Sequence, residues 1–453
     1  MYLERKMDQS LVEWKNKLDK NPALVVGIRQ CGKTETIEHF AKLHYKNYVK
    51  MNFWDNPKYC DDFNGEIDVN TLISNISLRF PNIVIEPHNT LIFFDEIQEC
   101  PRARLSFKNF AIDGRYDVIG SGSYLGINGY IIGDTTPVPT GYEDIYQMHT
   151  IDFEEFLWAN NIDKARIREL EKYFEEKKPI PETSNSIYKD LFLKYVCISG
   201  FPNAVKTYLN TRNIMEAVRI VQNIIFDIKG DFGRRKDKFG NPIFKASEVA
   251  RIQSAFELIP TFLSKENKRF IVSKILGGKS FEKSDAIEYL KQANIVSKVH
   301  NLENVSLPLL GNKITSQFKI FPNDIGIVSS MYGIDTIIAI NKGDLGQAGG
   351  AIYEAIAFDS LNKAGFDVFY FAKETGLEID MVICYKGDSY LVEVKKKNGN
   401  TKSAKTVMNN PNHYGKTKLL KIGDYNISED GDIITIPHYL VFVLSKNRNI
   451  WFY

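Results

Sequence analysis

Eight residues near the start of the chain have the types and spacing of a loop that binds phosphate. They fit the pattern GxxxxGK[ST], directly after an apolar segment and directly before a helix-like one. Glycines let backbone N–H groups converge on phosphate oxygens, and the following helix adds its positive dipole end. The residues are Gly27, Ile28, Arg29, Gln30, Cys31, Gly32, Lys33 and Thr34. They predict a nucleotide site; the alternative is a glycine-rich turn without a ligand.

Two side chains of this loop suit a nucleoside triphosphate. The Lys33 ammonium should reach the β- and γ-phosphates and take part in catalysis, and the Thr34 hydroxyl should be a ligand of Mg²⁺. Cys31 is interpreted as a small packing residue rather than a redox sensor. ATP and Mg²⁺ are therefore the expected cofactors, and the choice between ATP and GTP stays open.

A strand that ends in two carboxylates predicts the metal ligand and the general base that would act beside this loop. Four apolar residues precede Asp95 and Glu96. Asp95 should hold Mg²⁺ through its water shell, and Glu96 should polarise the water that attacks the γ-phosphate. Another strand runs into Ser121 and Ser123, which are candidates for contact with the γ-phosphate or that water. An ordinary serine–glycine turn is the alternative for these two residues.

A second group of charged residues, near the C-terminus, predicts a metal-dependent nuclease site. Glu393 and Lys395 lie two residues apart in one strand, so they share a face, and Asp380 belongs to the strand before it. The acids could hold a divalent metal while Lys395 stabilises the attacking water. Glu354, in the preceding helix, fits an accessory metal ligand. The alternatives are a Glu–Lys pair on a solvated edge and a decayed nuclease fold that only binds.

The elements that must position these groups alternate between strand-like and helix-like segments, which predicts an α/β fold class. Buried strands of a parallel sheet are expected at 23–27, 46–53, 90–95 and 116–121. Helices should follow from Phe153, and the stretch 179–186, with two prolines, reads as a linker or exposed loop.

Four domains are expected along the chain. They are a P-loop ATPase domain at 1–160, a helical region at 161–250, a winged-helix-like region at 251–335 and a nuclease-like α/β domain at 336–453. The winged-helix interpretation depends on a helix at 284–295 followed by strand-like segments at 296–302 and 318–324. Gly-rich residues 343–350 form a candidate hinge.

Composition and charge narrow the class of protein. The chain has 453 residues, of which 43% are apolar and 25% are charged, values typical of a folded multi-domain protein. A net charge of +2 is too small to indicate that the protein as a whole binds polyanions. No apolar run has the length of a membrane span, and the start lacks a secretory core, so we expect a cytoplasmic protein without a membrane partner. The five cysteines never form CxxC, which argues against a disulfide framework or a zinc site.

Two local basic segments, 229–238 and 395–405, make DNA or RNA a candidate partner through phosphate contacts. Solvated loops are the alternative. A second copy of the chain is a further candidate partner.

Several motifs occur in an order that resembles bacterial and archaeal AAA-type ATPases with a C-terminal domain of unknown function and a restriction-endonuclease-like core. The motifs are GIRQCGKTE (27–35), LIFFDEIQECPRA (91–103), IGSGSYL (119–125), IDFEEFL (151–157), YVCISGFPNAV (195–205), FKIFPNDIGI (318–327), and LEID and LVEVK near the end. The resemblance covers nearly the whole chain and implies a STAND-related switch that binds and hydrolyses ATP. Its C-terminal half would be nuclease-like, with an unassigned substrate.

One departure from that group concerns an arginine. Many members carry Gly-Arg where this chain has Gly141-Tyr142, so an arginine role at that point is in doubt. Arg102, Arg104 and Arg115 are the alternatives for stabilising charge on the phosphates.

The expected function is ATP hydrolysis whose nucleotide state sets the position of the C-terminal half. One alternative is a Mg²⁺-dependent nuclease gated by ATP. The other is a nucleotide-dependent module that binds DNA or protein with negligible turnover.

Overall fold

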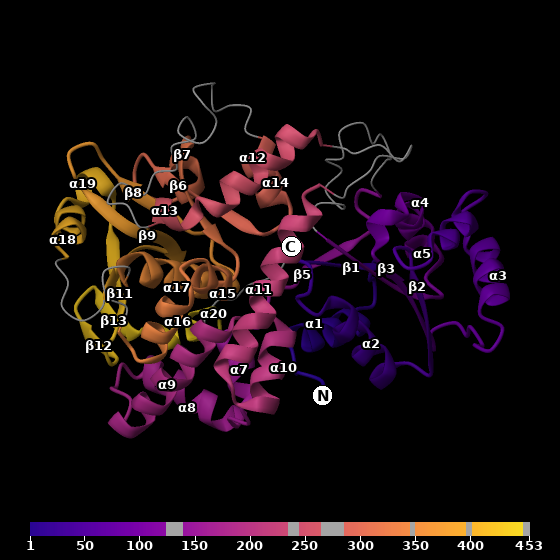
Figure 1. Cartoon of the computed structure of the whole chain (residues 1–453), viewed down its shortest axis with the longest axis horizontal. Helices are drawn as coiled ribbons and strands as arrows, with labels where there is room; N and C mark the ends of the chain where they lie inside the picture. Colours follow the sequence, from indigo (N-terminus) through magenta and orange to yellow (C-terminus); the bar gives the residue numbers. More distant parts are fainter. Residues whose placement is uncertain (124–138, 234–243, 264–284, 345–348, 396–400, 447–453) are drawn as a thin grey trace. The chain divides into compact units, whose positions relative to one another are not determined.

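A computed structural model describes the chain at residues 1–123, 139–233, 244–263, 285–344, 349–395 and 401–446 (Figure 1). The chain divides into two compact units, each of which is described by itself. The first consists of Met1–Ile151, Gly233–Lys245 and Gln292–Asn294, and the second of Asp152–Phe232, Ala246–Lys291 and Ile295–Tyr453.

The first unit is built on a five-stranded parallel sheet with the strand order β2-β3-β4-β1-β5. The strands are β1 (Ala23–Val26), β2 (Asn47–Asn52), β3 (Thr90–Asp95), β4 (Asp117–Gly122) and β5 (Asp144–Gln147). Every residue of β1, β3 and β4 is buried, as expected of parallel strands covered on both faces. The α/β class and the four expected strands are confirmed. The sequence does not predict β5, a short edge strand in which half-buried and exposed residues alternate.

Helices connect the parallel strands and cover the sheet. They are α1 (Lys6–Lys15), α2 (Lys33–His44), α3 (Val69–Arg79), α4 (Pro101–Leu105) and α5 (Phe107–Asp113), with 3₁₀ turns η1 (Pro57–Phe63) and η2 (Ile97–Glu99). Phe107 and Phe110 of α5 pack with β-strand residues in one buried core. Because β4 lies between β1 and β3, the carboxyl ends of these three strands meet at one edge of the sheet.

The second unit begins with helices. They are α7 (Phe153–Ala159), α8 (Lys164–Glu175), α9 (Glu182–Ile198), α10 (Pro202–Thr211), α11 (Ile214–Asp231), α12 (Ala246–Glu257), α13 (Ile259–Leu263), α14 (Asp285–Gln292), α15 (Ile325–Met331), α16 (Ile334–Asn341) and α17 (Gly349–Lys363). The linker predicted at 179–186 is wrong in its second half, because α9 starts at Glu182. Pro181 is the N-cap residue, a position where proline costs the helix no hydrogen bond.

A mixed eight-stranded sheet forms the rest of the second unit, in the order β12-β13-β11-β10-β9-β8-β6-β7. The strands are β6 (Val296–Leu302), β7 (Lys313–Pro322), β8 (Phe369–Ala372), β9 (Glu378–Tyr385), β10 (Asp388–Lys395), β11 (Thr417–Gly423), β12 (Ser428–Asp430) and β13 (Ile433–Pro437). The remaining elements are α18 (Lys402–Met408), α19 (Pro411–Tyr414), α20 (Val443–Lys446), η5 (Leu309–Asn312) and η7 (His438–Leu440). Helix α17 contacts β7 and β10, and α18 contacts β9 and β11.

The β6–β7 ribbon differs from the expectation of a separate winged-helix-like region. β6 pairs with β8, so the ribbon is an edge of the C-terminal sheet. The side chain of Asn301 makes this junction, since its Nδ2 donates to the Ala372 carbonyl at 3.0 Å and its Oδ1 accepts from the Ala372 N–H at 2.9 Å. These side-chain bonds add to the backbone pairing of Asn301 with Tyr370, and the hydrophobic pattern of the segment does not predict them.

Candidate functional site

The predicted phosphate loop connects β1 to α2, and its conformation needs its glycines. Gly32 has φ +99°, in the left-handed region that favours glycine. A Cβ on Gly27 would lie 2.2 Å from the Met148 carbonyl oxygen, so no larger residue fits there. Lys33 is buried, and its Nζ donates to the Gly27 and Ile28 carbonyls at 3.1 Å each. The ammonium group therefore lies over the loop, where phosphate would bind.

A residue that sequence reasoning missed supports the loop from outside. Arg5 is buried, and it donates from Nη1 to the Cys31 carbonyl at 2.8 Å and from Nη2 to the His149 carbonyl at 2.7 Å. It links the loop to the segment after β5. The Cys31 thiol is fully buried and lies 3.6 Å from the Met148 carbonyl oxygen, as expected of a packing residue. No local motif marks Arg5, because its partners are backbone carbonyls far away in the sequence.

Asp95, at the end of β3, lies beside this loop. Its side chain is 1% exposed, and the Thr34 hydroxyl donates to its Oδ1 at 3.1 Å. The Ser121 hydroxyl, at the end of β4, donates to the same oxygen. The structure therefore brings together the three predicted residues Thr34, Asp95 and Ser121. Hydroxyl and carboxylate oxygens side by side are the donor set that Mg²⁺ prefers.

Two residues of β2 complete the surroundings of Asp95. Asn52 is its register partner across the sheet and donates from Nδ2 to Oδ2 at 3.2 Å. Lys50 Nζ lies 3.4 Å from the same oxygen and 2.7 Å from Glu38 Oε1. Burial lowers the pKa of Lys50, but Glu38 and Asp95 outweigh it, and the net shift is upward. Lys50 thus stays charged and partly neutralises Asp95.

Glu96 follows Asp95 in a left-handed conformation, with φ +53°. The chain leaves the extended strand conformation at this residue. The Glu96 Oε2 atom accepts a hydrogen bond from Gln98 Nε2 in η2. Glu96 is half-buried, whereas Asp95 is enclosed. Ser123 is buried, and its hydroxyl has no hydrogen-bond partner among the residues that the structure describes.

The three candidate arginines all have structural partners. Arg102 donates to the Phe63 and Gly65 carbonyls. Arg104 forms a two-bond pair with Glu143, and Arg115 forms one with Asp113. Each guanidinium is used within the fold, so no role toward phosphate is assigned to any of them.

The predicted C-terminal residues lie together on and beside β10. Lys395 Nζ lies 2.9 Å from Glu393 Oε2 and 3.4 Å from Asp380 Oδ2. Asp380 Oδ2 also accepts from the Val394 N–H at 2.9 Å, which joins β9 to β10 at this point. Two acids therefore share one ammonium group.

A second lysine, which the sequence analysis did not single out, lies at the same site. Lys319 on β7 is 2% exposed and lies 3.9 Å from Glu354 Oε2 and 3.1 Å from Glu378 Oε1. Burial lowers the pKa of Lys319. The three acids Glu354, Glu378 and Asp380 raise it by more than burial lowers it, so the net shift is upward. Glu354 thus lies beside Lys319, and it also contributes to the electrostatic environment of Glu393.

The electrostatics of Glu393 reflect this crowding. Burial, followed by Asp380, raises its pKa to about 7, although Lys395 acts in the opposite direction. A carboxyl group whose pKa is raised toward 7 by burial and by a neighbouring negative charge is typical of functional sites. Among the described residues, no three His, Cys, Asp or Glu side chains are grouped as a metal site. Each of the three acids lies beside a lysine instead. The metal roles of Glu354, Asp380 and Glu393 stay a prediction.

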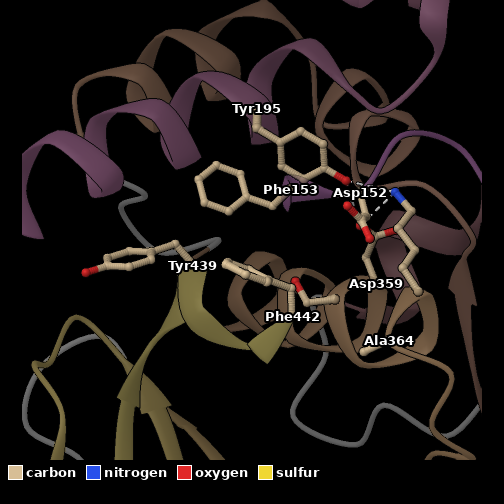
Figure 2. A pocket seen from close by; sticks show the side chains of 9 residues that line it. Asp152, Phe153, Tyr195, Asp359, Ala364, Tyr439 and Phe442 are labelled. Carbon is tan, nitrogen blue, oxygen red and sulfur yellow. Dashed lines mark hydrogen bonds and ion pairs between the residues drawn. The ribbon is translucent and has the colours of Figure 1, made fainter. Parts of the chain in front are cut away.

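A pocket in the second unit lies among residues that the sequence analysis did not predict as functional. Its lining is Asp152, Phe153, Tyr195, Asp359, Ser360, Lys363, Ala364, Tyr439 and Phe442. Figure 2 shows the Phe153 ring beside the rings of Tyr195 and Phe442, with the Tyr195 hydroxyl pointing toward Asp359. Aromatic rings line one side of this pocket, and the buried charged residues Asp359 and Lys363 line another.

Lys363 is the centre of that cluster. Its Nζ lies 3.0 Å from Asp359 Oδ2, 3.4 Å from Asp324 Oδ2 and 2.9 Å from the Tyr195 hydroxyl. Asp324 in turn accepts from the Ser199 hydroxyl at 2.6 Å and caps α15. The cluster ties α9, α15 and α17 together, and two carboxylates share one cation. Burial raises the pKa of Asp359 to about 7, and Asp324 adds to the rise, although Lys363 opposes it.

Asp359→Asn is expected to change how stability depends on pH. The folded chain keeps a proton on Asp359 between its ordinary pKa of 3.8 and about 7, where the unfolded chain has lost it. The free energy of unfolding of the wild type should therefore fall as the pH rises through this window, by about 1.4 kcal/mol per unit at most, relative to the variant. Urea unfolding at several pH values measures the difference. Asp190→Asn, at an exposed ion pair on α9, is the control; parallel curves for wild type and Asp359→Asn would contradict the assignment.

Parts of the other predicted features lie outside the described residues. These are 234–238 of the first basic segment, 396–400 of the second and 345–348 of the candidate hinge. In the part of the chain that the structure describes, no helix is long and apolar enough to cross a membrane.

Comparisons with known proteins agree with the first unit. Residues 19–157 match the family model of an AAA domain, 189–337 match a domain of unknown function (DUF8612), and 349–439 match another (DUF4143). A search of curated proteins finds no match.

Solved structures are similar at low identity. The Aeropyrum pernix ORC2 protein with ADPNP and ADP is 11% identical, covering 76% of this chain and 93% of that chain, with a TM-score of 0.33. The A. pernix ORC1 protein in complex with DNA is 12% identical, covering 75% and 94%, with a TM-score of 0.25. A STAND protein with a tetratricopeptide repeat sensor from Pyrococcus horikoshii is 12% identical, covering 80% and 49%, with a TM-score of 0.23. We draw no conclusion from these scores. The AAA-domain match and the geometry around Asp95 together support an AAA-type, ATP-binding domain at residues 19–157.

Proposed function

We propose that this chain binds ATP with Mg²⁺ and hydrolyses it at the carboxyl edge of the first unit's sheet. The contact between the Thr34 hydroxyl and the Asp95 carboxylate, beside Lys33, is the observation that carries the proposal. Mg²⁺, when bound, would neutralise charge that develops on the phosphate oxygens. Thr34 and Asp95 would hold it, and Ser121 and Asn52 would orient the Asp95 carboxylate.

The remaining residues of the loop have separate tasks in this proposal. Backbone N–H groups of residues 27–34 would bind the phosphates, and the Lys33 ammonium would turn from its carbonyl partners to the β- and γ-phosphates. Glu96 would accept a proton from the attacking water. The expected reaction is ATP and water to ADP and phosphate.

Lys33→Ala is expected to weaken ATP binding by at least about a hundredfold. The variant loses several charge-assisted hydrogen bonds, each of which contributes about 1.5–3 kcal/mol. Calorimetric titration with Mg-ATP measures the affinity. Lys46→Ala, at the Lys46–Glu86 ion pair just before β2, removes an equal charge and should leave the affinity unchanged. Equal affinities for wild type and Lys33→Ala would refute the nucleotide site.

A second function is supported by the C-terminal cluster. We infer that residues 336–453 form a restriction-endonuclease-like domain in which Asp380, Glu393 and Lys395 act on a phosphodiester of DNA or RNA. Support comes from the shared ammonium contact and from the raised pKa of the Glu393 carboxyl. The element order α17, β8, β9, β10, α18, β11, with β11 parallel to β10, puts these residues at the centre of a sheet.

In this proposal the ATP site of the first unit controls the C-terminal site. The ATPase domain at 1–160 would set, through its nucleotide state, the position of the C-terminal half. Phosphate release by the full chain, with and without DNA and RNA, tests this coupling. Stimulation by either nucleic acid supports it. An unchanged rate favours a protein partner or a second copy of the chain.

A further inference from the structure

Two cysteines that are far apart in the sequence meet beside the proposed catalytic turn. Cys60 lies in η1 and Cys100 directly precedes α4, and the Cys60 sulfur lies 3.7 Å from the carbonyl oxygen of Glu99, the residue that precedes Cys100. Cys100 is 3% exposed and belongs to the buried core of the first unit, and the half-buried Cys60 packs against that core. Both residues are free thiols.

The backbone around the pair is held in place by other contacts. Arg102 donates from the start of α4 to the Phe63 and Gly65 carbonyls at the end of η1. The packing of η1 on α4 therefore brings the two cysteines close together.

The two thiols differ in reactivity. The hydrogen bond from Cys100 lowers the pKa of the Cys60 thiol, against the effect of burial. The same bond, with burial, raises the pKa of Cys100. Cys60, which is also the more exposed, is thus the thiol that would react first as a thiolate, and Cys100 is positioned as the resolving thiol.

We propose that Cys60 and Cys100 form a reversible disulfide on exposure to a small-molecule disulfide such as oxidised glutathione. The Cys60 thiolate attacks the glutathione disulfide, forming a Cys60–glutathione bond and releasing one glutathione thiolate. Cys100 then loses its proton and attacks the Cys60 sulfur, releasing the second glutathione. One protein disulfide forms and one glutathione disulfide is reduced, so electrons balance.

The position of the bond predicts its consequence, which rests on the proposed ATPase function. The sulfurs must approach to about 2.05 Å, which pulls on residues 97–100. That turn includes Gln98, whose side chain holds the Glu96 carboxylate. A displaced Glu96 should slow hydrolysis by about tenfold or more, because catalytic groups tolerate little misplacement. Nucleotide binding at residues 27–34 should change little.

The experiment treats the full chain with reduced or oxidised glutathione and maps its peptides without reduction. A Cys60–Cys100 cross-linked peptide in the wild type is expected. Cys60→Ser and, separately, Cys100→Ala should both lack it. The ATP hydrolysis rate should fall on oxidation, recover with dithiothreitol, and stay constant in Cys60→Ser. Cys384, on β9, serves as an internal control thiol.

Each outcome decides one part of the proposal. Only a glutathione adduct on Cys60, or no cross-linked peptide, would overturn the disulfide. A cross-linked peptide with an unchanged hydrolysis rate would overturn the link to Glu96 and keep the modification site. If the reduced wild type does not hydrolyse ATP, the proposed function fails, and peptide mapping still decides the disulfide.

Discussion

Glu96→Gln should leave ATP binding intact and lower the rate of ATP hydrolysis by at least about a hundredfold. Glutamine keeps the size and the polar contact to Gln98, but it cannot accept a proton from water, and loss of a general base costs about 10²–10⁴ in rate. The phosphate loop is unaffected, because Lys33, Thr34 and Asp95 keep their contacts. Binding and catalysis should therefore separate in this variant.

Single-turnover phosphate release gives the rate, and calorimetry gives the affinity for Mg-ATP. Glu99→Gln is the matched control, since this exposed carboxylate lies in the same turn and should not alter either quantity. Equal turnover in wild type and Glu96→Gln would remove Glu96 from the mechanism. A parallel loss of affinity would instead indicate that Glu96 supports the loop.

Sequence patterns predict the central part of the nucleotide site because that part is local. A strand, eight loop residues and a helix follow one another without a break, so spacing alone places Lys33 and Thr34. Asp95 and Ser121 end buried parallel strands, and parallel strands end at the same edge. The order β3-β4-β1 then brings both residues to the loop.

The supporting residues could not be predicted in this way. Arg5 bonds to carbonyls of two distant segments, and Asn52 and Lys50 reach Asp95 only through the register of β2 on β3. These contacts depend on tertiary structure and leave no spacing signal. The sequence does not predict β5 for a related reason: it is four residues long, and none of its residues is fully buried.

The second unit shows the same limit on a larger scale. β6 and β7 are recognisable as a ribbon, but a ribbon pairs equally well in a winged helix or on the edge of a larger sheet. The structure shows the second arrangement, in which Asn301 makes two hydrogen bonds to Ala372 across the junction of β6 and β8. Lys319 is buried on β7 and reaches Glu354 and Glu378, which follow it on other elements, so a search for acidic motifs alone does not find it.

The two lysines define how the C-terminal site should respond to mutation. Lys395→Ala leaves Asp380 and Glu393 without their shared cation, whereas the neighbouring acids Glu354 and Glu378 keep Lys319. In the proposed nuclease function, Lys395 stabilises charge on the attacked phosphate, and its loss is expected to reduce the rate by about 10²-fold or more.

Glu393→Ala and Lys395→Ala should therefore each abolish cleavage of DNA or RNA that Mg²⁺ or Mn²⁺ supports in the wild type, and should leave ATP hydrolysis by the first unit intact. Labelled duplex and single-stranded substrates, incubated with the full chain and ATP, measure cleavage. Lys418→Ala removes a lysine of the same sheet from a half-exposed pair with Asp388, so it controls for loss of positive charge. Cleavage that persists in both Glu393→Ala and Lys395→Ala would exclude this site as its source.

Binding of nucleic acid without cleavage would instead favour a decayed nuclease fold. In that case Lys395 contacts phosphate, so Lys395→Ala should weaken binding and Lys418→Ala should not.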